Sequence, residues 1–336
     1  MAHTVTLEPD NTTFTVDDDE TILAAAKRQG LNLPHSCQNG ICGQCKADQL
    51  SGKIIQETHA EQALPSEELA QGKILMCCCK TASDVTLKIP GYNGSKLPSV
   101  KTLPVRVASV EFKHDVAIVT LTLPKAPPFI FLAGQYIDIM LKNNQCRSYS
   151  IASATNQNGL IELHIRKREG GLFTGMLFGE NTPIKEKTIM RIRGPLGTFT
   201  LKNSNKPIIM LATGTGFAPI RSLLLQLIAD KSQRSVHLYW GARQEADLYC
   251  LSEAAALVAQ LSNSKFTPVL SRPNSVWQGE RGYIQSTVAR DYPNLADYEV
   301  YACGSTAMIN GAQQHLEKEC SLPPDAFLSD AFSPAV

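Results

Sequence analysis

Six of the ten cysteines in this chain lie between positions 37 and 79, and their spacing restricts what the N-terminal part can fold into. Cys37, Cys42 and Cys45 follow the pattern C-x4-C-x2-C. A disulfide framework belongs to secreted proteins, and the N-terminus lacks the basic segment and apolar run of a signal peptide. The cysteines are therefore best interpreted as metal ligands. With a distant fourth cysteine, this spacing is that of a [2Fe–2S] site.

The fourth ligand is expected in the run Cys77-Cys78-Cys79, which follows the segment Gly-Lys-Ile-Leu-Met. The loop and this run resemble the plant-type ferredoxin family, in which the fourth ligand comes just after a Gly-x-x-Leu-x stretch. The resemblance selects Cys77, and leaves open whether Cys78 or Cys79 is a buried neighbour. The alternative is a zinc site or structural thiols, but zinc sites favour paired C-x2-C elements and only one is present. Clusters of this type have potentials near about −400 mV, which suits an electron donor.

Composition narrows the range of partners. The chain has 336 residues, a net charge of +1, 43% hydrophobic residues and 19% charged residues, as in ordinary globular proteins of two or three domains. The charge balance gives no reason to expect a nucleic-acid partner. The sequence contains no run of 18 apolar residues, so we expect no membrane span. We expect a cytoplasmic, monomeric protein.

The pattern of elements changes twice along the chain. Residues 1–89 read as one unit, with strands over 3–7 and 12–16 and a helix over 21–29 that one of the acids at 17–20 caps. Residues 90–103 are rich in turn formers and read as a linker. Residues 104–202 contain short alternating strands typical of an antiparallel barrel, at 105–112, 116–123, 136–141, 161–166 and 189–192. Residues 203–336 repeat strand, loop and helix, with strands at 208–212, 236–240, 265–270 and 299–302, which predicts a doubly wound parallel sheet.

The barrel region carries the motif Arg147-Ser148-Tyr149-Ser150. An arginine can pair with a flavin phosphate, a tyrosine can stack on the isoalloxazine, and the Ser150 hydroxyl can hydrogen-bond the ring edge near N5. The motif matches the R-x-Y-S signature of the ferredoxin–NADP reductase-like family, and Gly134-Gln135-Tyr136 precedes it as in that family. In isolation the motif could be an ordinary strand end.

A second glycine segment follows the motif and resembles the phosphate loop of the same family. Gly170, Gly171 and Thr174 would offer N–H and hydroxyl donors to the flavin pyrophosphate. The resemblance also implies that the backbone of His164 and Ile165 lines the flavin site. We expect the His164 side chain to bond a local partner and not to take part in catalysis. The order of modules, with the cluster domain first, matches the members of the family that use FAD and not FMN.

The C-terminal part carries the run Gly214-Thr215-Gly216-Phe-Ala-Pro between an apolar strand and a helix. Glycines let a pyrophosphate approach, and the helix N-terminus is partly positive. The run resembles the pyridine-nucleotide loop of the family, although an isolated G-x-G can be a plain turn. Cys303-Gly304 matches the cysteine–glycine motif that lies near the nicotinamide in the family, with a small buried strand residue as the alternative. The tail Ser329-Asp330-Ala331-Phe332 resembles the family's terminal segment, whose aromatic residue covers the flavin.

The choice between NADH and NADPH depends on charge. Proteins that recognise the 2′-phosphate of NADPH do so with Arg or Lys. In this chain the candidates are Arg243 and Arg272. Glu245 and Asp247 would repel a phosphate, which favours NADH.

Across its whole length the chain is similar to the reductase components of bacterial multicomponent oxygenases and, more, to the CDP-6-deoxy-3,4-glucoseen reductases. The resemblance implies an α+β ferredoxin-like (β-grasp) [2Fe–2S] domain, an antiparallel β-barrel FAD domain and an α/β NAD(P) domain. It implies an oxidoreductase that takes hydride from NADH or NADPH onto FAD and passes single electrons through the cluster to a partner enzyme. That partner would be a pyridoxamine-dependent CDP-4-keto-6-deoxyglucose-3-dehydratase or an oxygenase component. The implied catalytic residues are Tyr149, Ser150 and Cys303, with Phe332 at the flavin. A free flavin reductase and a non-enzymatic iron–sulfur redox sensor are the alternatives.

Overall fold

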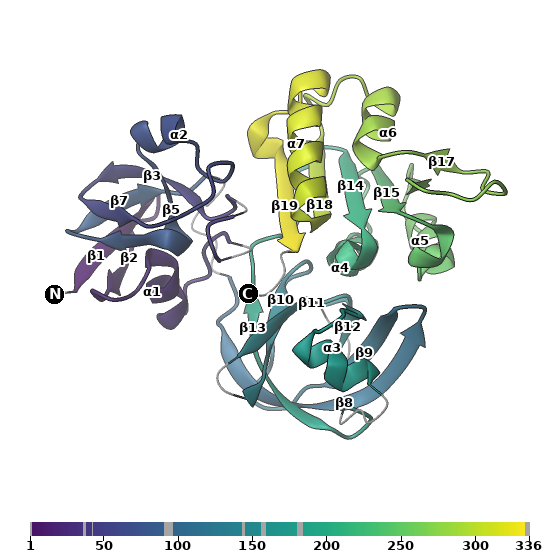
Figure 1. Cartoon of the computed structure of the whole chain (residues 1–336), viewed down its shortest axis with the longest axis horizontal. Coiled ribbons are helices and arrows are strands. Elements are labelled where there is room, and N and C mark those ends of the chain that lie inside the picture. The colour runs from purple at the N-terminus through teal and green to yellow at the C-terminus, as the bar shows by residue number, and fades with distance from the viewer. Residues whose placement is uncertain are drawn as a thin grey trace. The chain divides into compact units, whose positions relative to one another are not determined.

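The chain folds into two compact units in the computed structural model, which describes residues 2–35, 38–41, 43–90, 97–142, 145–155, 159–179 and 184–332. One unit comprises Met1–Val100 with Leu196–Thr198, and the other comprises Lys101–Pro195 and Phe199–Val336 (Figure 1). Residues 91–96 of the segment expected as a linker lie outside the described residues. Residues 101–103 of that segment belong to the first barrel strand.

The first unit is a mixed five-stranded sheet with one main helix, in keeping with the expected β-grasp fold. The sheet order is β2-β1-β7-β3-β5, and β1 and β7 run parallel to each other. The strands are β1 (His3–Glu8), β2 (Thr12–Val16), β3 (Lys46–Ser51), β5 (Lys73–Leu75) and β7 (Val85–Lys88), and β4 (Ile54–Gln56) pairs separately with β6 (Cys79–Thr81). A short helix α2 (Ser66–Ala70) precedes β5.

Helix α1 (Ile22–Arg28) buries Ile22, Leu23, Ala25 and Ala26 in the core of this unit. Its N-cap is Thr21, whose side chain accepts a hydrogen bond from the Ala24 N–H at 3.2 Å. The expectation that an acid of positions 17–20 caps the helix is therefore wrong. Glu20 instead forms an ion pair with Arg28 in the last turn.

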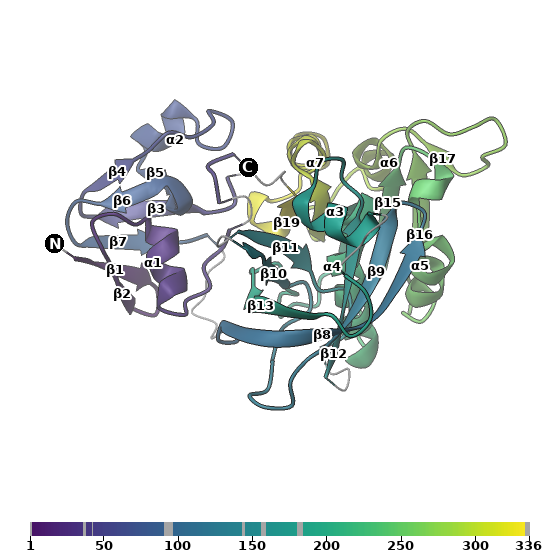
Figure 2. The same cartoon turned by 60° about the horizontal axis from the view of Figure 1, so that its bottom comes forward.

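The second unit begins with a six-stranded antiparallel barrel, which confirms the expected fold of this region (Figure 2). The strand order is β11-β10-β13-β8-β9-β12, and a bridge between Ile151 and Leu163 joins the two ends. The elements are β8 (Lys101–Lys113), β9 (Val116–Thr122), β10 (Tyr136–Met140), β11 (Cys146–Ser150), β12 (Leu160–Arg166), β13 (Ile189–Leu196) and helix α3 (Leu172–Phe178). The R-x-Y-S motif is itself strand β11, which the strand pattern had not predicted.

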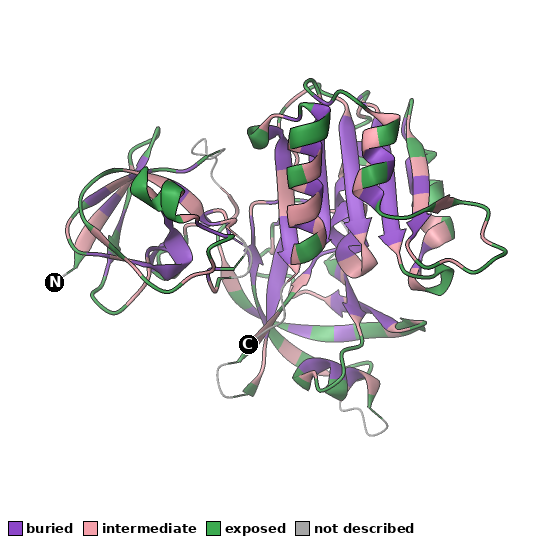
Figure 3. Cartoon of the chain, turned by 45° about the horizontal axis from the view of Figure 1, so that its top comes forward, coloured by how far each residue is buried: buried purple, intermediate pink, exposed green. Residues whose placement is uncertain are grey.

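A parallel sheet of order β17-β16-β15-β14-β18-β19 completes the second unit. Its strands are β14 (Ile208–Thr213), β15 (Val236–Ala242), β16 (Lys265–Leu270), β17 (Glu280–Arg281), β18 (Glu299–Ser305) and β19 (Phe327–Phe332). Helices α4 (Phe217–Ala229) and α5 (Leu251–Val258) pack on one face, and α6 (Ile284–Asp291) and α7 (Thr306–Cys320) pack on the other. Figure 3 shows the strands buried between these layers. The chain order reverses at β14, so a ligand is expected at the carboxyl ends of β14 and β18.

A buried ion pair fixes the connection between barrel and sheet. Arg234 Nη2 lies 2.6 Å from Glu299 Oε2, and the Tyr301 hydroxyl donates to the same oxygen at 2.9 Å. The Lys202 N–H donates to the Tyr301 hydroxyl. Burial alone would raise the pKa of Glu299, but hydrogen bonds from Arg234 and Tyr301 outweigh it and lower the pKa.

Among the helices that the structure describes, none combines the length and apolarity needed to cross a bilayer.

Candidate cofactor and nucleotide sites

The cysteine loop is in the first unit, and two of its four expected ligands can be placed. Cys37 and Cys42 lie outside the described residues. The Sγ atoms of Cys45 and Cys77 are 3.1 Å apart, and both residues are buried. The Met76 N–H donates to the Cys45 carbonyl at 3.0 Å, which ties the two ligand segments together. This convergence of buried thiols without a disulfide fits a pair of cluster ligands.

Two glycines shape the loop around these sulfurs. Gly40 and Gly43 both have φ +74°, a left-handed conformation that side chains disfavour. The Gly40 carbonyl accepts from the Ala60 N–H at 3.0 Å, and a Cβ at Gly43 would lie 3.0 Å from the Ala63 carbonyl oxygen. The segment 60–63 therefore supports the loop from outside, and the loop has no room for larger residues at these two positions.

Strand β11 presents Arg147 and Tyr149 on one face of the barrel, since alternate residues of a strand share a face. Among the described residues, no ion pair engages Arg147, and its guanidinium donates a hydrogen bond to the Cys146 carbonyl at 2.8 Å. Its charge is thus available to a phosphate. The Tyr149 ring lies 5.4 Å from that of Phe173, and burial raises the pKa of its hydroxyl. An uncompensated arginine beside a neutral aromatic ring fits a flavin nucleotide.

The glycine segment before α3 has open space on one side. Nothing lies within 4 Å of where a Cβ at Gly170 would be. At Gly171 a Cβ would meet Thr174 Oγ1 at 2.3 Å. The Thr174 hydroxyl donates to the Arg168 carbonyl at 3.0 Å, so its single proton is already engaged. The Gly171 N–H donates to the same carbonyl at 3.1 Å, so phosphate donors in this segment would come from its other backbone N–H groups.

Strand β12 carries His164 and Ile165, both buried. His164 Nδ1 lies 2.8 Å from the Tyr249 hydroxyl, and Nε2 lies 2.9 Å from Glu162 Oε1. Burial lowers the pKa of His164, although Glu162 opposes this. Both ring nitrogens thus have local partners, so at His164 only the backbone is left to line a cofactor.

The nucleotide loop packs backbone against backbone. Gly214–Gly216 forms a 3-10 turn between β14 and α4. A Cβ at Gly216 would lie 2.1 Å from the Cys303 carbonyl oxygen, and a Cβ at Gly304 would lie 2.0 Å from Thr213 Oγ1. Trp240 Nε1 donates to the Gly214 carbonyl at 3.2 Å, and its ring stacks on Phe217 at 4.2 Å. The carboxyl ends of β14 and β18 therefore meet closely where the nucleotide is expected.

Ser150 and Cys303 come together through Asp330, a residue that the sequence interpretation had not assigned to the site. The Ser150 hydroxyl lies 3.5 Å from Asp330 Oδ2, and Asp330 is the register partner of Cys303 on β19. Cys303 is fully buried, and burial together with the Asp330 charge raises the pKa of its thiol well above the ordinary value. The thiol is thus neutral at physiological pH. The only sequence signal for Asp330 was its place in the tail motif, two residues before Phe332.

A pocket of about 1000 Å³ opens at the carboxyl ends of these strands. Arg243 and Arg272 line it, and among the described residues neither forms an ion pair. Asp247 also lines it, but Arg166 Nη2 lies 2.6 Å from its carboxylate. The repulsion that Asp247 was expected to exert on a phosphate is thereby reduced. Other lining residues are Thr213, Gly214, Thr215, Tyr283, Ser305 and Phe332.

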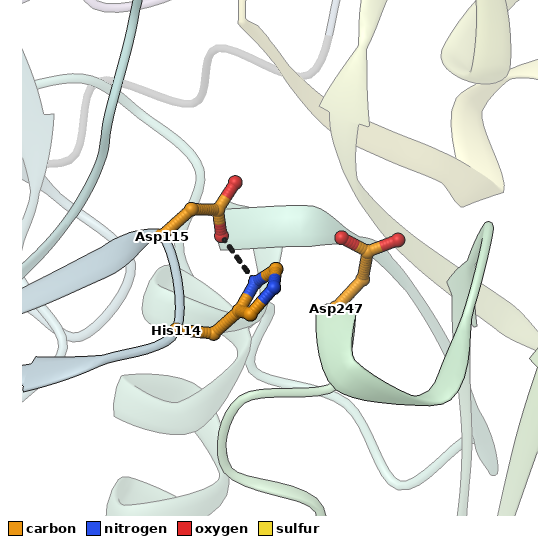
Figure 4. A group of neighbouring side chains, drawn as sticks. All are labelled: His114, Asp115 and Asp247. Carbon is orange, nitrogen blue, oxygen red and sulfur yellow. Dashed lines mark hydrogen bonds and ion pairs between the residues drawn. The ribbon is translucent and has the colours of Figure 1, made fainter.

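Asp115 and Asp247 line this pocket, and together with His114 they form a group whose ligand atoms lie within 4.8 Å of one another (Figure 4). The arrangement has the residue types of a cation site. Arg166, however, contacts both carboxylates at 2.6 Å, through Nε to Asp115 and through Nη2 to Asp247. Because one guanidinium is paired with both acids, this cluster is an ion-pair network that braces β12 against the nucleotide-binding sheet.

Three family models match the chain in the order that the motifs predict. Residues 5–82 match a 2Fe-2S iron-sulfur cluster binding domain. Residues 105–201 match an oxidoreductase FAD-binding domain, and residues 210–314 match an oxidoreductase NAD-binding domain.

Similar proteins cover nearly the whole chain. A CDP-6-deoxy-L-threo-D-glycero-4-hexulose-3-dehydrase reductase of Yersinia pestis is 40% identical over 336 residues, covering 100% of each chain. The xylene/toluene monooxygenase electron transfer component XylA of Pseudomonas putida is 32% identical and covers 93% of this chain and 89% of its own. Among solved structures, the cytochrome P450 reductase GcoB of Amycolatopsis has a TM-score of 0.80 at 27% identity, covering 99% of each chain.

Proposed function

The chain belongs to the iron–sulfur flavoprotein reductases, electron-transfer oxidoreductases that use FAD, a [2Fe–2S] cluster and NADH or NADPH, and we propose that its electron acceptor is a 3-dehydratase of a CDP-linked 4-keto-6-deoxyhexose. The observation that carries this choice is similarity along the complete length: the dehydrase reductase of Yersinia pestis is 40% identical, against 32% for the monooxygenase component of Pseudomonas putida. An oxygenase component is the other candidate acceptor.

The bound groups supply the redox chemistry: FAD accepts a hydride and the cluster carries one electron at a time. The chain's own residues bind and orient them. Cys37, Cys42, Cys45 and Cys77 are proposed as the iron ligands. Arg147 is proposed to hold a flavin phosphate and Tyr149 to cover the ring. Backbone N–H groups around Gly170 and Gly171 are proposed to hold the pyrophosphate.

Ser150, Cys303 and Asp330 are proposed to order the point of hydride transfer. Asp330 accepts a hydrogen bond from the Ser150 hydroxyl, so the Ser150 oxygen is left as an acceptor toward the flavin edge. Cys303 is a neutral thiol, and it acts by position and not as a nucleophile. Room for the nucleotide is proposed to come from Gly214, Thr215, Gly216 and Gly304. Phe332 lines the same pocket and is proposed to close it beside the nucleotide.

We infer NADH as the preferred nucleotide, and steady-state kinetics with both nucleotides test this. With ferricyanide as acceptor, kcat/KM for NADH is expected to exceed that for NADPH. Arg272→Gln should lower kcat/KM for NADPH about tenfold, since it removes a cation that a 2′-phosphate can use, and leave NADH within about twofold. A more than tenfold preference of the unaltered protein for NADPH would show that Arg243 and Arg272 read the phosphate and that the inference is wrong.

Reconstitution with purified acceptors tests the proposed function. The chain, NADH and a dehydratase acting on CDP-4-keto-6-deoxyglucose are expected to give 3-deoxygenated product at least about tenfold faster than the same chain drives an aromatic-ring or alkane oxygenase component, as expected for a specific interface. Faster turnover with the oxygenase would reverse the assignment of the acceptor. The expected monomeric state and cytoplasmic location stay predictions.

A further inference from the structure

The three consecutive cysteines have different surroundings. Cys77 and Cys78 belong to the 3-10 turn Met76–Cys78, whereas Cys79 begins strand β6. Cys78 Sγ lies 3.5 Å from Cys77 Sγ, which in turn lies 3.1 Å from Cys45 Sγ. Cys79 Sγ points elsewhere, 3.7 Å from the Lys80 carbonyl oxygen, and this residue is fully buried. The turn therefore brings two adjacent thiols to one side and directs the third into the core.

The position of Cys78 is fixed from two directions. Its carbonyl oxygen accepts hydrogen bonds from the Glu57 N–H at 2.7 Å and from Gln56 Nε2 at 2.8 Å. The other end of the Gln56 amide, Oε1, accepts from the Leu75 N–H at 2.9 Å. One glutamine side chain thus spans the turn from Leu75 to Cys78. These hydrogen bonds hold the backbone of the turn in place, and in that position Cys78 Sγ lies against Cys77 Sγ at 3.5 Å.

The cluster loop is built to accommodate the Cys78 sulfur. A Cβ at Gly40 would lie 2.7 Å from Cys78 Sγ, closer than such contacts occur. Gly40 lies midway between Cys37 and Cys42 in sequence. The Cys78 thiol therefore packs against the loop that carries three proposed ligands, while it contacts the fourth. A sulfur kept only for packing would not need this contact with the proposed ligand.

From this geometry we propose that Cys78 is a positioning residue of the cluster, and that its S–H donates a hydrogen bond to the Cys77 sulfur when that sulfur binds iron. The inference rests on the proposed function, since it requires Cys77 to be a ligand. A donor to a ligand sulfur stabilises negative charge, and reduction adds one electron to the cluster. The hydrogen bond consequently favours the reduced form and raises the reduction potential. Four ligands are available without Cys78, so it acts through Cys77 and not on iron.

Redox titration of the complete protein, followed by the electron paramagnetic resonance signal of the reduced cluster, tests this role. Cys78→Ala should keep its iron and sulfide but lower the equilibrium constant for cluster reduction three- to tenfold, where tenfold corresponds to about 59 mV for one electron. Cys78→Ser retains a donor, and its equilibrium constant should stay within about twofold of the unaltered protein. Cys79→Ala is the matched control and should leave the potential unchanged.

Three other outcomes would overturn the proposal or the function on which it rests, and they can be told apart. Equal potentials for the alanine and serine variants and the unaltered protein would mean that Cys78 only packs. Loss of the cluster in Cys78→Ala, with retention in Cys77→Ala, would make Cys78 the ligand. An unaltered protein without iron would refute the proposed function instead. Should the alanine variant unfold, Cys78→Val, which fills space without a donor, takes its place in the titration and is expected to show the same fall.

Discussion

Replacing Cys77 by alanine is expected to lower electron transfer to a one-electron protein acceptor by more than about 100-fold, because three of the four cysteine ligands are not enough to hold a plant-type cluster. Reduction of ferricyanide by NADH should stay within about twofold, since this small acceptor takes electrons from the flavin, which the second unit binds. Reduction of cytochrome c and of ferricyanide by the same preparation measures the two routes. Iron and sulfide contents report the loss of the cluster directly.

Cys79→Ala serves as the control for this experiment. Its sulfur contacts the Lys80 carbonyl oxygen, whereas the Cys45 sulfur contacts that of Cys77, so the variant is expected to keep both activities. Loss of both activities in a folded Cys77→Ala protein would contradict the proposed order of carriers, because it would mean that the flavin route also needs the cluster. Retention of both would remove Cys77 from the ligand set and return Cys78 to consideration.

Motifs in which a backbone contact or a ligand fixes the residue type were readable from sequence. The loop around Cys37, Cys42 and Cys45 and the run at Gly214–Gly216 are of this kind, and both family models and fold agree with the modules that they indicated. The apolar strands of the parallel sheet were also found, since buried parallel strands are continuous apolar runs. For these segments, local sequence and tertiary environment require the same residues.

Features that depend on pairing with distant parts of the chain could not be predicted from the sequence. Strand β11 has the sequence Cys-Arg-Ser-Tyr-Ser, which lacks the apolar alternation from which a strand could be predicted. Thr21 caps α1 although four acids precede it, since Glu20 is engaged with Arg28. Asp330 enters the site only because β19 adds in parallel to β18, which places it opposite Cys303. No local pattern predicts that pairing.

Gly216→Ala is expected to lower kcat/KM for the nucleotide at least about 100-fold, because a displacement of about 1 Å at a reaction centre has costs of this size. The new Cβ would lie 2.1 Å from the Cys303 carbonyl oxygen and 2.5 Å from its carbonyl carbon. Neither atom can rotate away, as both belong to the backbone of β18 between two strands. Either the nucleotide loop or the end of β18 must shift, and both border the pocket.

The effect should appear in the nucleotide step and spare the rest of the protein. Gly311→Ala is the matched control: Gly311 lies in α7 of the same sheet domain, its nearest contact would be Gln285 Nε2 at 3.8 Å, and alanine is expected to raise stability by roughly 0.5–1 kcal/mol. Flavin absorbance and iron content of Gly216→Ala should equal those of the unaltered protein, while NAD⁺ no longer perturbs the flavin spectrum. An unchanged KM and kcat would mean that the close approach of Gly216 to Cys303 does not shape the nucleotide site.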